Sequence, residues 1–131
     1  MPTVLYVLFT LAFMPLVIAG IAAVLRMKQF GHIDNNYPRI QQGEMKGLGA
    51  RVNAAQANSW EALIFFSVMI LIAYASGLPL DRLDTAAIAF LVLRIIHFGV
   101  YALNWATLRT LVFYLCLACC IYIFYLAASH G

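Results

Sequence analysis

Residues 51–62 read RVNAAQANSWEA, and residues 63–78 continue as LIFFSVMILIAYASGL. The second stretch carries no charged side chain. Joined to the first, it exceeds the roughly 20 mainly apolar residues that a helix needs to cross a bilayer. The first stretch is polar and places Glu61 directly before the uncharged run. Because a carboxylate is costly at that depth, the segment predicts a membrane helix with a functional polar end.

The composition of the whole chain agrees with an integral membrane protein. Of the 131 residues, 65% are hydrophobic and 10% are charged, whereas a soluble domain carries about 25% charged residues. The length allows one domain. The eight Lys and Arg residues are dispersed and form no basic run, so we expect no nucleic-acid partner and instead expect membrane lipids around the chain.

Four apolar segments predict an all-α integral membrane protein built as a four-transmembrane-helix bundle. The stretch between the first two segments, residues 28–50, contains four glycines and one proline and is predicted to be a polar loop. Residues 77–81 are predicted to form a tight turn. The predicted spans cover about residues 3–27, 51–76, 84–106 and 110–129.

The distribution of Lys and Arg predicts how these spans are oriented. The first connection and its edges, together with Arg109 in the third connection, hold six basic residues, whereas the second connection holds only Arg82. Basic residues concentrate in cytoplasmic loops. The first and third connections are therefore predicted to face the cytoplasm, with both termini on the opposite side.

The three cysteines, Cys116, Cys119 and Cys120, all lie in the last apolar segment. An odd number of cysteines on one helix does not make a disulfide framework. The segment offers no other type of metal ligand. We interpret the cysteines as small packing residues and expect no metal site.

Polar side chains recur at helical spacing inside the second and third spans. Asn58 and Glu61 are three residues apart, and Arg94, His97 and Tyr101 follow at intervals of three and four. Residues with these spacings share one helix face. Each of the two spans therefore carries one polar stripe.

The short turn between these spans predicts an antiparallel hairpin in which the two stripes meet. In such a hairpin, residues equally far from the turn lie at the same depth. Glu61 is then opposite Arg94, and Arg51 is opposite Asn104 near the cytoplasmic edge. Glu61 then lies roughly 15 Å below Arg51, and Arg94 neutralises its charge. Two interpretations remain open. Either the pair only fixes how the spans dock, or the stripe lines a polar pocket open to the cytoplasmic side.

Three short motifs resemble the MAPEG family, the membrane-associated proteins of eicosanoid and glutathione metabolism. Residues 58–61 (NSWE) are similar to the family's Asn-x-x-Glu on the second helix. Residues 94–101 (RIIHFGVY) are similar to its Arg-x-x-His-x-x-x-Tyr on the third, and residues 106–110 (ATLRT) to its arginine and small hydroxyl residue at the start of the fourth. The motifs occur in order, and the resemblance covers nearly the whole chain.

This resemblance implies a homotrimer that binds glutathione as a co-substrate between neighbouring subunits, near the cytoplasmic helix ends. Arg109 and Thr110 would stabilise the glutathione thiolate, whose lowered pKa makes it the nucleophile. Arg94 would support Glu61. The residues implied in glutathione binding are Asn58, Glu61, Arg94, His97, Tyr101, Arg109, Arg51 and, from the next subunit, Arg26.

The function implied by the resemblance is that of a glutathione transferase or peroxidase acting on lipophilic electrophiles or lipid hydroperoxides. A non-catalytic membrane protein of the same scaffold, binding a lipid or an anionic ligand, is the alternative. Ala57 bears on this choice, because active family members commonly have an arginine at that position. A small transporter or channel is a third hypothesis. The absence of charged side chains within the first and fourth spans speaks against it.

Overall fold

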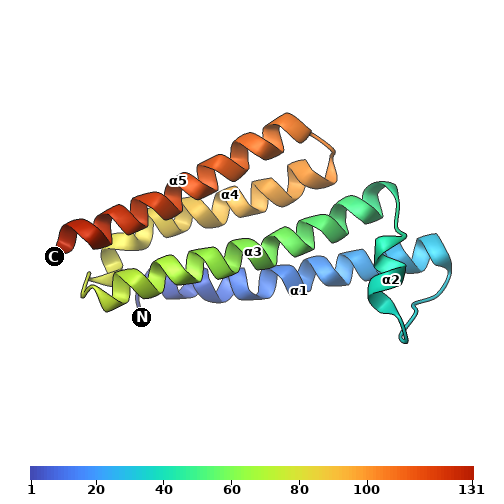
Figure 1. The fold of residues 1–131 in the computed structure, drawn as a ribbon, viewed down its shortest axis with the longest axis horizontal. Helices are drawn as coiled ribbons and strands as arrows, with labels where there is room; N and C mark the ends of the chain where they lie inside the picture. The colour runs from blue at the N-terminus through green and yellow to red at the C-terminus, as the bar shows by residue number, and fades with distance from the viewer.

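The computed structural model describes residues 1–131 and consists of helices without strands (Figure 1). Its four long helices are long and apolar enough to cross a membrane. The prediction of an all-α fold with four membrane-crossing helices is therefore confirmed. The elements are α1 (Thr3–Phe30), α2 (Pro38–Gly43), α3 (Gly47–Ala75), the 3₁₀ turn η1 (Leu80–Leu83), α4 (Asp84–Ala102) and α5 (Ala106–His130).

The first connection is shorter and more ordered than the sequence predicts. It runs from residue 31 to residue 46, because both flanking helices extend into the predicted loop. The buried side chain of Gln41 organises it. Gln41 Nε2 donates to the carbonyl oxygen of His32 at 3.0 Å, and the backbone N–H of Asp34 donates to Gln41 Oε1 at 2.9 Å. The amide of Gln41 thus ties α2 to the segment that precedes it and satisfies two backbone groups of that segment.

The end of α4 differs from the predicted boundary at residue 106. Asn104 has a φ of 61°, a left-handed conformation that asparagine adopts more readily than most residues. The N–H of Trp105 donates to the carbonyl of Val100 at 3.0 Å, and the N–H of Asn104 to that of Tyr101 at 3.1 Å. These are the two hydrogen bonds of a Schellman C-cap. Asn104 therefore lies in the turn, and its predicted place on the polar stripe opposite Arg51 is wrong.

The four long helices pack as two pairs. The most extensive contacts join α1 to α3 and α4 to α5. The predicted hairpin of α3 and α4 is in contact, but it is not the main packing pair. In Figure 1 the α4–α5 pair diverges from the α1–α3 pair towards the end that carries α2.

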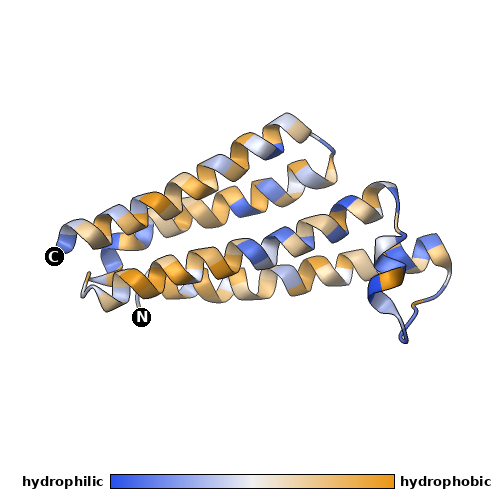
Figure 2. Ribbon diagram, in the orientation of Figure 1, coloured by the Kyte–Doolittle hydropathy of each residue, from blue (hydrophilic) through white to orange (hydrophobic).

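The apolar core fills the opposite end, where the pairs converge. It includes Val4 of α1 and Ala127 of α5, and the stacked rings of Phe66 and Phe90 lie 4.4 Å apart between their centroids. Figure 2 shows polar residues gathered instead in α2, its flanking loop, and the nearby halves of α3 and α4. The main apolar core thus holds the bundle at one end, and polar side chains, together with a smaller apolar cluster around Val52, occupy the other.

Both chain termini lie at the converged end together with η1 (Figure 1). The loop containing α2 and the turn between α4 and α5 lie at the divergent end. Many large apolar side chains point outward from all four helices, as expected where lipid or a neighbouring chain replaces water. The predicted grouping of the connections thus holds in space, and the side of the membrane that each group faces stays a prediction.

Candidate functional site

A buried arginine lies at the centre of the polar residues. Arg94 on α4 is 2% exposed, and its Nη2 donates to Asn58 Oδ1 of α3 at 2.8 Å. Asn58 Nδ2 in turn donates to Glu61 Oε2 at 3.4 Å. The amide of Asn58 therefore bridges the guanidinium of one helix and the carboxylate of the other.

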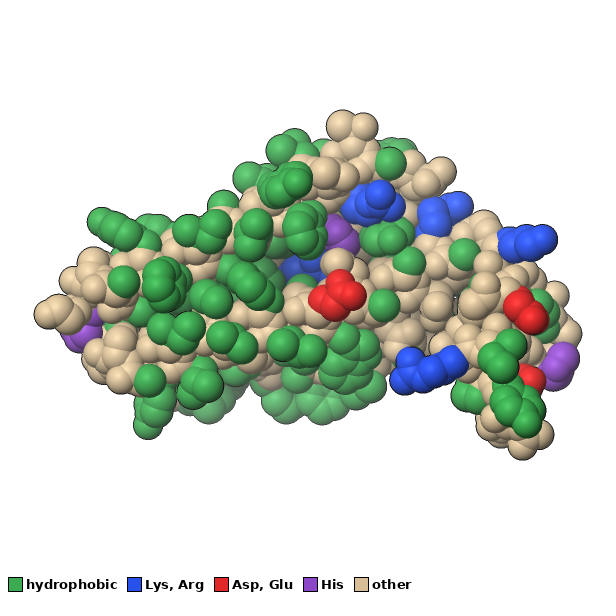
Figure 3. Space-filling view, in the orientation of Figure 1, with side chains coloured by type: hydrophobic (Ala, Val, Ile, Leu, Met, Phe, Trp, Pro, Cys, Tyr) green, Lys and Arg blue, Asp and Glu red, His purple; other side chains and the backbone are tan.

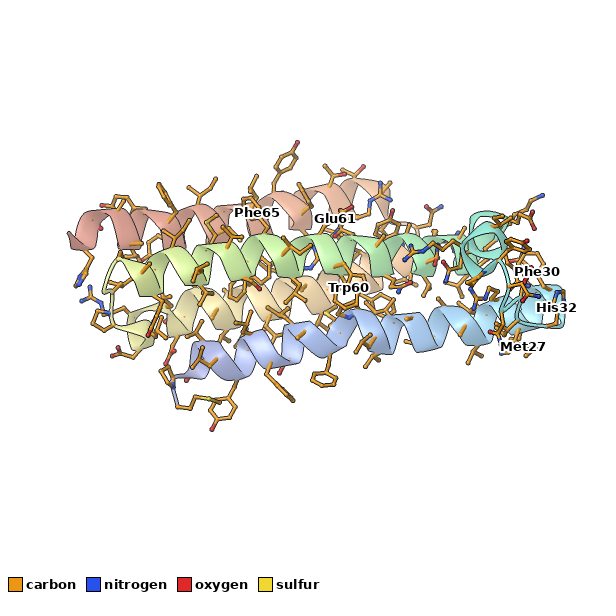
Figure 4. The ribbon with its side chains drawn as sticks, turned by 60° about the horizontal axis from the view of Figure 1, so that its bottom comes forward. Met27, Phe30, His32, Trp60, Glu61 and Phe65 are labelled. Atoms are coloured by element: carbon orange, nitrogen blue, oxygen red, sulfur yellow. The ribbon has the colours of Figure 1, made fainter.

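The predicted direct ion pair between Glu61 and Arg94 is wrong. Arg94 lies level with Asn58, about one helical turn from the expected partner. The reason is that contacts with α1 and α5, in addition to the short turn, set how α3 and α4 slide against each other. Glu61 is exposed, on the side of α3 that faces α5 in Figure 4.

Asn58, His97, Tyr101, Arg109 and Thr110 do come together. They line one open pocket of about 240 Å³ between α3, α4 and the start of α5. The guanidinium carbon of Arg109 lies 4.5 Å from the centroid of the Tyr101 ring, which is cation–π geometry. The ring of His97 meets the same tyrosine edge to face at 5.7 Å. Tyr101 thus orients two nitrogen-bearing side chains in the pocket.

His97 provides an unpaired polar atom at this site. The side chain is 2% exposed, and its Nδ1 has no hydrogen-bond partner. A buried polar group without a partner costs free energy and calls for a specific explanation, such as a ligand. By contrast, Thr110 Oγ1 donates to the carbonyl oxygen of Ala106 at 3.1 Å, so its hydrogen atom is already used within α5.

Two predicted ligands lie outside the pocket within one chain. Arg26 is 7% exposed, and its Nη1 donates to the carbonyl of Pro38 at 3.4 Å, which ties α1 to α2. Arg51 Nε donates to the carbonyl of Ala102 at 3.0 Å, which ties α3 to the end of α4. In the single chain, both arginines join helices rather than line the site.

The sequence interpretation missed the contribution of α5 beyond Thr110. Phe113 and Tyr114 line the polar pocket, and Cys116 and Cys120 line a cavity beside it. Residues 113, 116 and 120 follow the three- and four-residue spacing of one helix face. That signal was present in the sequence, but an apolar face in an apolar span gives no reason to select it.

The fold and this site define a multi-pass integral membrane protein with a buried polar centre near one end of a helix bundle. A comparison with known protein families matches residues 3–129 to the MAPEG family. The chain therefore belongs to the MAPEG family, and the resemblance seen in its motifs is confirmed. No curated protein and no solved structure matches the chain significantly.

Proposed function

We propose that this protein binds glutathione in the polar pocket and uses its thiolate against lipophilic electrophiles or lipid hydroperoxides. The observation that carries the proposal is the convergence of Arg109, His97, Tyr101 and Asn58 on one pocket in a MAPEG-family chain. Glutathione has two carboxylates and one amine. Arginine matches a carboxylate, and the exposed carboxylate of Glu61 next to the pocket matches the amine.

Arg109 is the residue proposed to stabilise the thiolate. Arg109 is half-buried, and its guanidinium lies over the Tyr101 ring. A fixed positive charge beside a thiol lowers the pKa of that thiol, and the thiolate is the reactive form. Thr110 is proposed to assist, but its hydroxyl hydrogen already serves Ala106. We therefore assign the larger share of thiolate stabilisation to Arg109.

We further propose that the protein works as a homotrimer in which a neighbouring subunit completes the pocket. The pocket volume of about 240 Å³ lies below the roughly 300–1,000 Å³ usual for sites that enclose a small molecule. A second polar hollow lies between α2 and α3 and is lined by Gln42, Asn53 and Gln56 among others. Polar surface on a membrane helix requires a partner, and a second copy of the chain supplies one.

We propose Lys28, rather than Arg26, as the basic residue that a neighbouring subunit contributes to the pocket. Arg26 is buried against Pro38 in its own chain. Lys28, two residues further on and in the last turn of α1, is exposed. Lys28 is therefore better placed than Arg26 to reach a glutathione carboxylate held mainly by the next subunit.

A glutathione titration of the detergent-solubilised protein tests the proposal. We expect a saturable rise in thiolate absorbance and turnover with a broad thiol-reactive electrophile. Arg109→Ala should abolish both signals, whereas Arg82→Ala, which removes an exposed arginine at the other end of the bundle, should leave them unchanged. Absence of any thiolate signal and of any turnover in the unaltered protein would refute the proposed function.

The second candidate is a non-catalytic binding protein on the same scaffold. Ala57 favours it, because this exposed position on α3 carries no arginine that could add to the site. This candidate predicts saturable binding of glutathione or another anionic ligand without a thiolate signal and without turnover. The same titration therefore separates the two functions.

A further inference from the structure

The polar hollow between α2 and α3 is separate from the pocket that contains Arg109. It has a volume of about 460 Å³ and shares no lining residue with that pocket. Trp60 lines the hollow. Figure 4 shows Trp60 on the side of α3 that faces α1, whereas Glu61 and Phe65 lie on the side that faces α5. A ligand in the hollow would therefore not occupy the proposed glutathione site.

The lining of this hollow is polar and positively charged. Arg39 is its one charged side chain and is exposed, and no aspartate or glutamate contributes to it. Three amide side chains, those of Gln42, Asn53 and Gln56, supply further N–H donors. Guanidinium and amide N–H groups together match the oxygens of a phosphate. A ligand that also carries an ammonium group would find no carboxylate among these residues.

The lengths of the helices place the hollow at the membrane surface. Helix α3 has 29 residues and α4 has 19. At a rise of 1.5 Å per residue, α4 is about 28 Å long, close to the roughly 30 Å of the hydrocarbon core, and α3 is about 15 Å longer. In Figure 1, α3 projects beyond α4 at the end that carries α2, and Figure 3 shows basic side chains gathered at this end. The hollow therefore lies at the level of the lipid headgroups.

Below the hollow, the same face of α3 becomes apolar. Asn53 and Leu71 are 18 residues apart, which is five full turns, so they point in the same direction. Trp60, Ile64 and Leu71 follow at intervals of four and seven along this face, and all three are exposed. The rise from Trp60 to Leu71 is about 16 Å, close to half of the hydrocarbon core. A polar hollow above an apolar strip one leaflet deep matches the shape of a phospholipid.

We propose that the hollow binds the phosphate of an anionic phospholipid from the leaflet next to α2, with one acyl chain lying along this face of α3. Arg39 pairs with the phosphate, and the neighbouring amides donate hydrogen bonds to its remaining oxygens. This leaflet is predicted to be the cytoplasmic one, whose surface carries anionic lipids. In the proposed trimer the lipid lies at the boundary between two copies, because a second chain would cover α3 around Gln56.

The bound phosphate would tie α2 to α3. Within the chain, α2 is held to α1 by the hydrogen bond from Arg26 to Pro38, and to its preceding segment by Gln41. A phosphate between Arg39 of α2 and Asn53 of α3 joins these two helices across the hollow. The lipid composition of one leaflet thus bears on the position of α2.

Tryptophan fluorescence tests the site in vesicles of defined composition. The chain has two tryptophans, so Trp105→Phe leaves Trp60 as the only one. Phosphatidylglycerol brominated on its acyl chains should quench Trp60 at about fivefold lower mole fraction than brominated phosphatidylcholine. Arg39→Gln should remove this difference. Arg82→Gln, the matched change at the other end of the bundle, should keep it.

The same measurement separates the lipid from other occupants. Inorganic phosphate, exchanged for chloride at constant ionic strength, should leave the quenching unchanged; its loss would overturn the proposal in favour of a free anion. A preference for phosphatidylglycerol that survives in Arg39→Gln would also overturn it. So would weak quenching by both lipids, because a second chain alone would then fill the hollow. Arg109→Ala should keep the lipid preference, so failure of the lipid site and failure of the proposed function are distinguishable.

Discussion

Arg94 brings a positive charge into the middle of the bundle, and Asn58 accepts a hydrogen bond from its guanidinium. The 2.8 Å hydrogen bond from Arg94 leaves the amide nitrogen of Asn58 free to approach Glu61 at 3.4 Å. An amide can serve both partners because it has a donor and an acceptor on one rigid group. At the residue scale, the site therefore depends on Asn58 for its geometry and on Glu61 for its charge.

This division of roles predicts different effects on stability. Asn58→Ala should lower the free energy of unfolding by about 2 kcal/mol, because it leaves a buried guanidinium without its partner. Glu61→Gln should change it by less than about 0.5 kcal/mol, because the side chain is exposed. Denaturation in detergent, followed by circular dichroism, measures both. A loss in Glu61→Gln as large as in Asn58→Ala would indicate that the two charges interact directly.

At the element scale, the turn between α4 and α5 positions the pocket. The Schellman cap at Asn104 ends α4 directly after Tyr101 and Ala102 and allows α5 to begin at Ala106. Arg109 then stands in the first turns of α5, where its guanidinium reaches the ring of Tyr101. A longer α4 would carry Arg109 away from this ring, so the left-handed residue in the turn is part of how the site is built.

Substitutions at this turn test its conformation. Asn104→Val should destabilise the protein by about 1–2 kcal/mol, because a β-branched residue is strained at positive φ. Asn104→Gly should be tolerated, since glycine adopts this conformation without a steric penalty. Leu103→Val is the matched control, because Leu103 is exposed and has a right-handed conformation with φ of −76°. Equal thermal stability of all three variants would show that the turn does not require a left-handed residue.

At the scale of the whole molecule, the packing of helices in two pairs explains why the polar site lies at one end. The pairs converge around an apolar core that includes Phe66 and Phe90 and diverge beyond it (Figure 1). At the divergent end a hydrogen bond from Arg51 to Ala102 and a small apolar cluster around Val52 still join the two pairs, and the polar pocket lies beside them. A polar pocket and an apolar cavity can therefore sit next to each other at the same end of the bundle.

The orientation in the membrane can be tested with single cysteines. Lys46 and Ser76 are exposed in the two opposite groups of connections. A membrane-impermeant maleimide should label Ser76→Cys in intact cells and Lys46→Cys only after the cells are permeabilised, because the basic connections are predicted to be cytoplasmic. The unaltered protein, with its natural cysteines on α5, provides the background. The reverse labelling pattern would show that the orientation is inverted.

The proposed trimer predicts a complex of three times the chain mass of 14.6 kDa. Its cause would be the outward-facing polar surface of α3 around Gln56 and Trp60, which a second chain can cover. Native mass spectrometry from mild detergent measures the complex, and chemical cross-linking in the original membranes controls for dissociation. A monomer or dimer by both methods would contradict the trimer.

The sequence by itself determined the all-α membrane fold, the number of membrane-crossing helices and most members of the polar pocket. These follow from local rules: length and hydropathy select a membrane helix, and three- or four-residue spacing assigns side chains to one face. It also predicted that Asn58, His97, Tyr101 and Arg109 belong together, because the motifs place them on neighbouring helices.

Only the tertiary structure decided the register of α3 against α4, the end of α4 at Asn104, and the apolar cavity beside the pocket. Register depends on every helix that packs against the pair, and the contacts of α3 with α1 and of α4 with α5 outweigh the short turn. The cavity arises where three apolar faces fail to meet, and an apolar residue looks the same in the sequence whether it fills a core or lines a space. The register of α3 against α4 makes Asn58, rather than Glu61, the direct partner of Arg94.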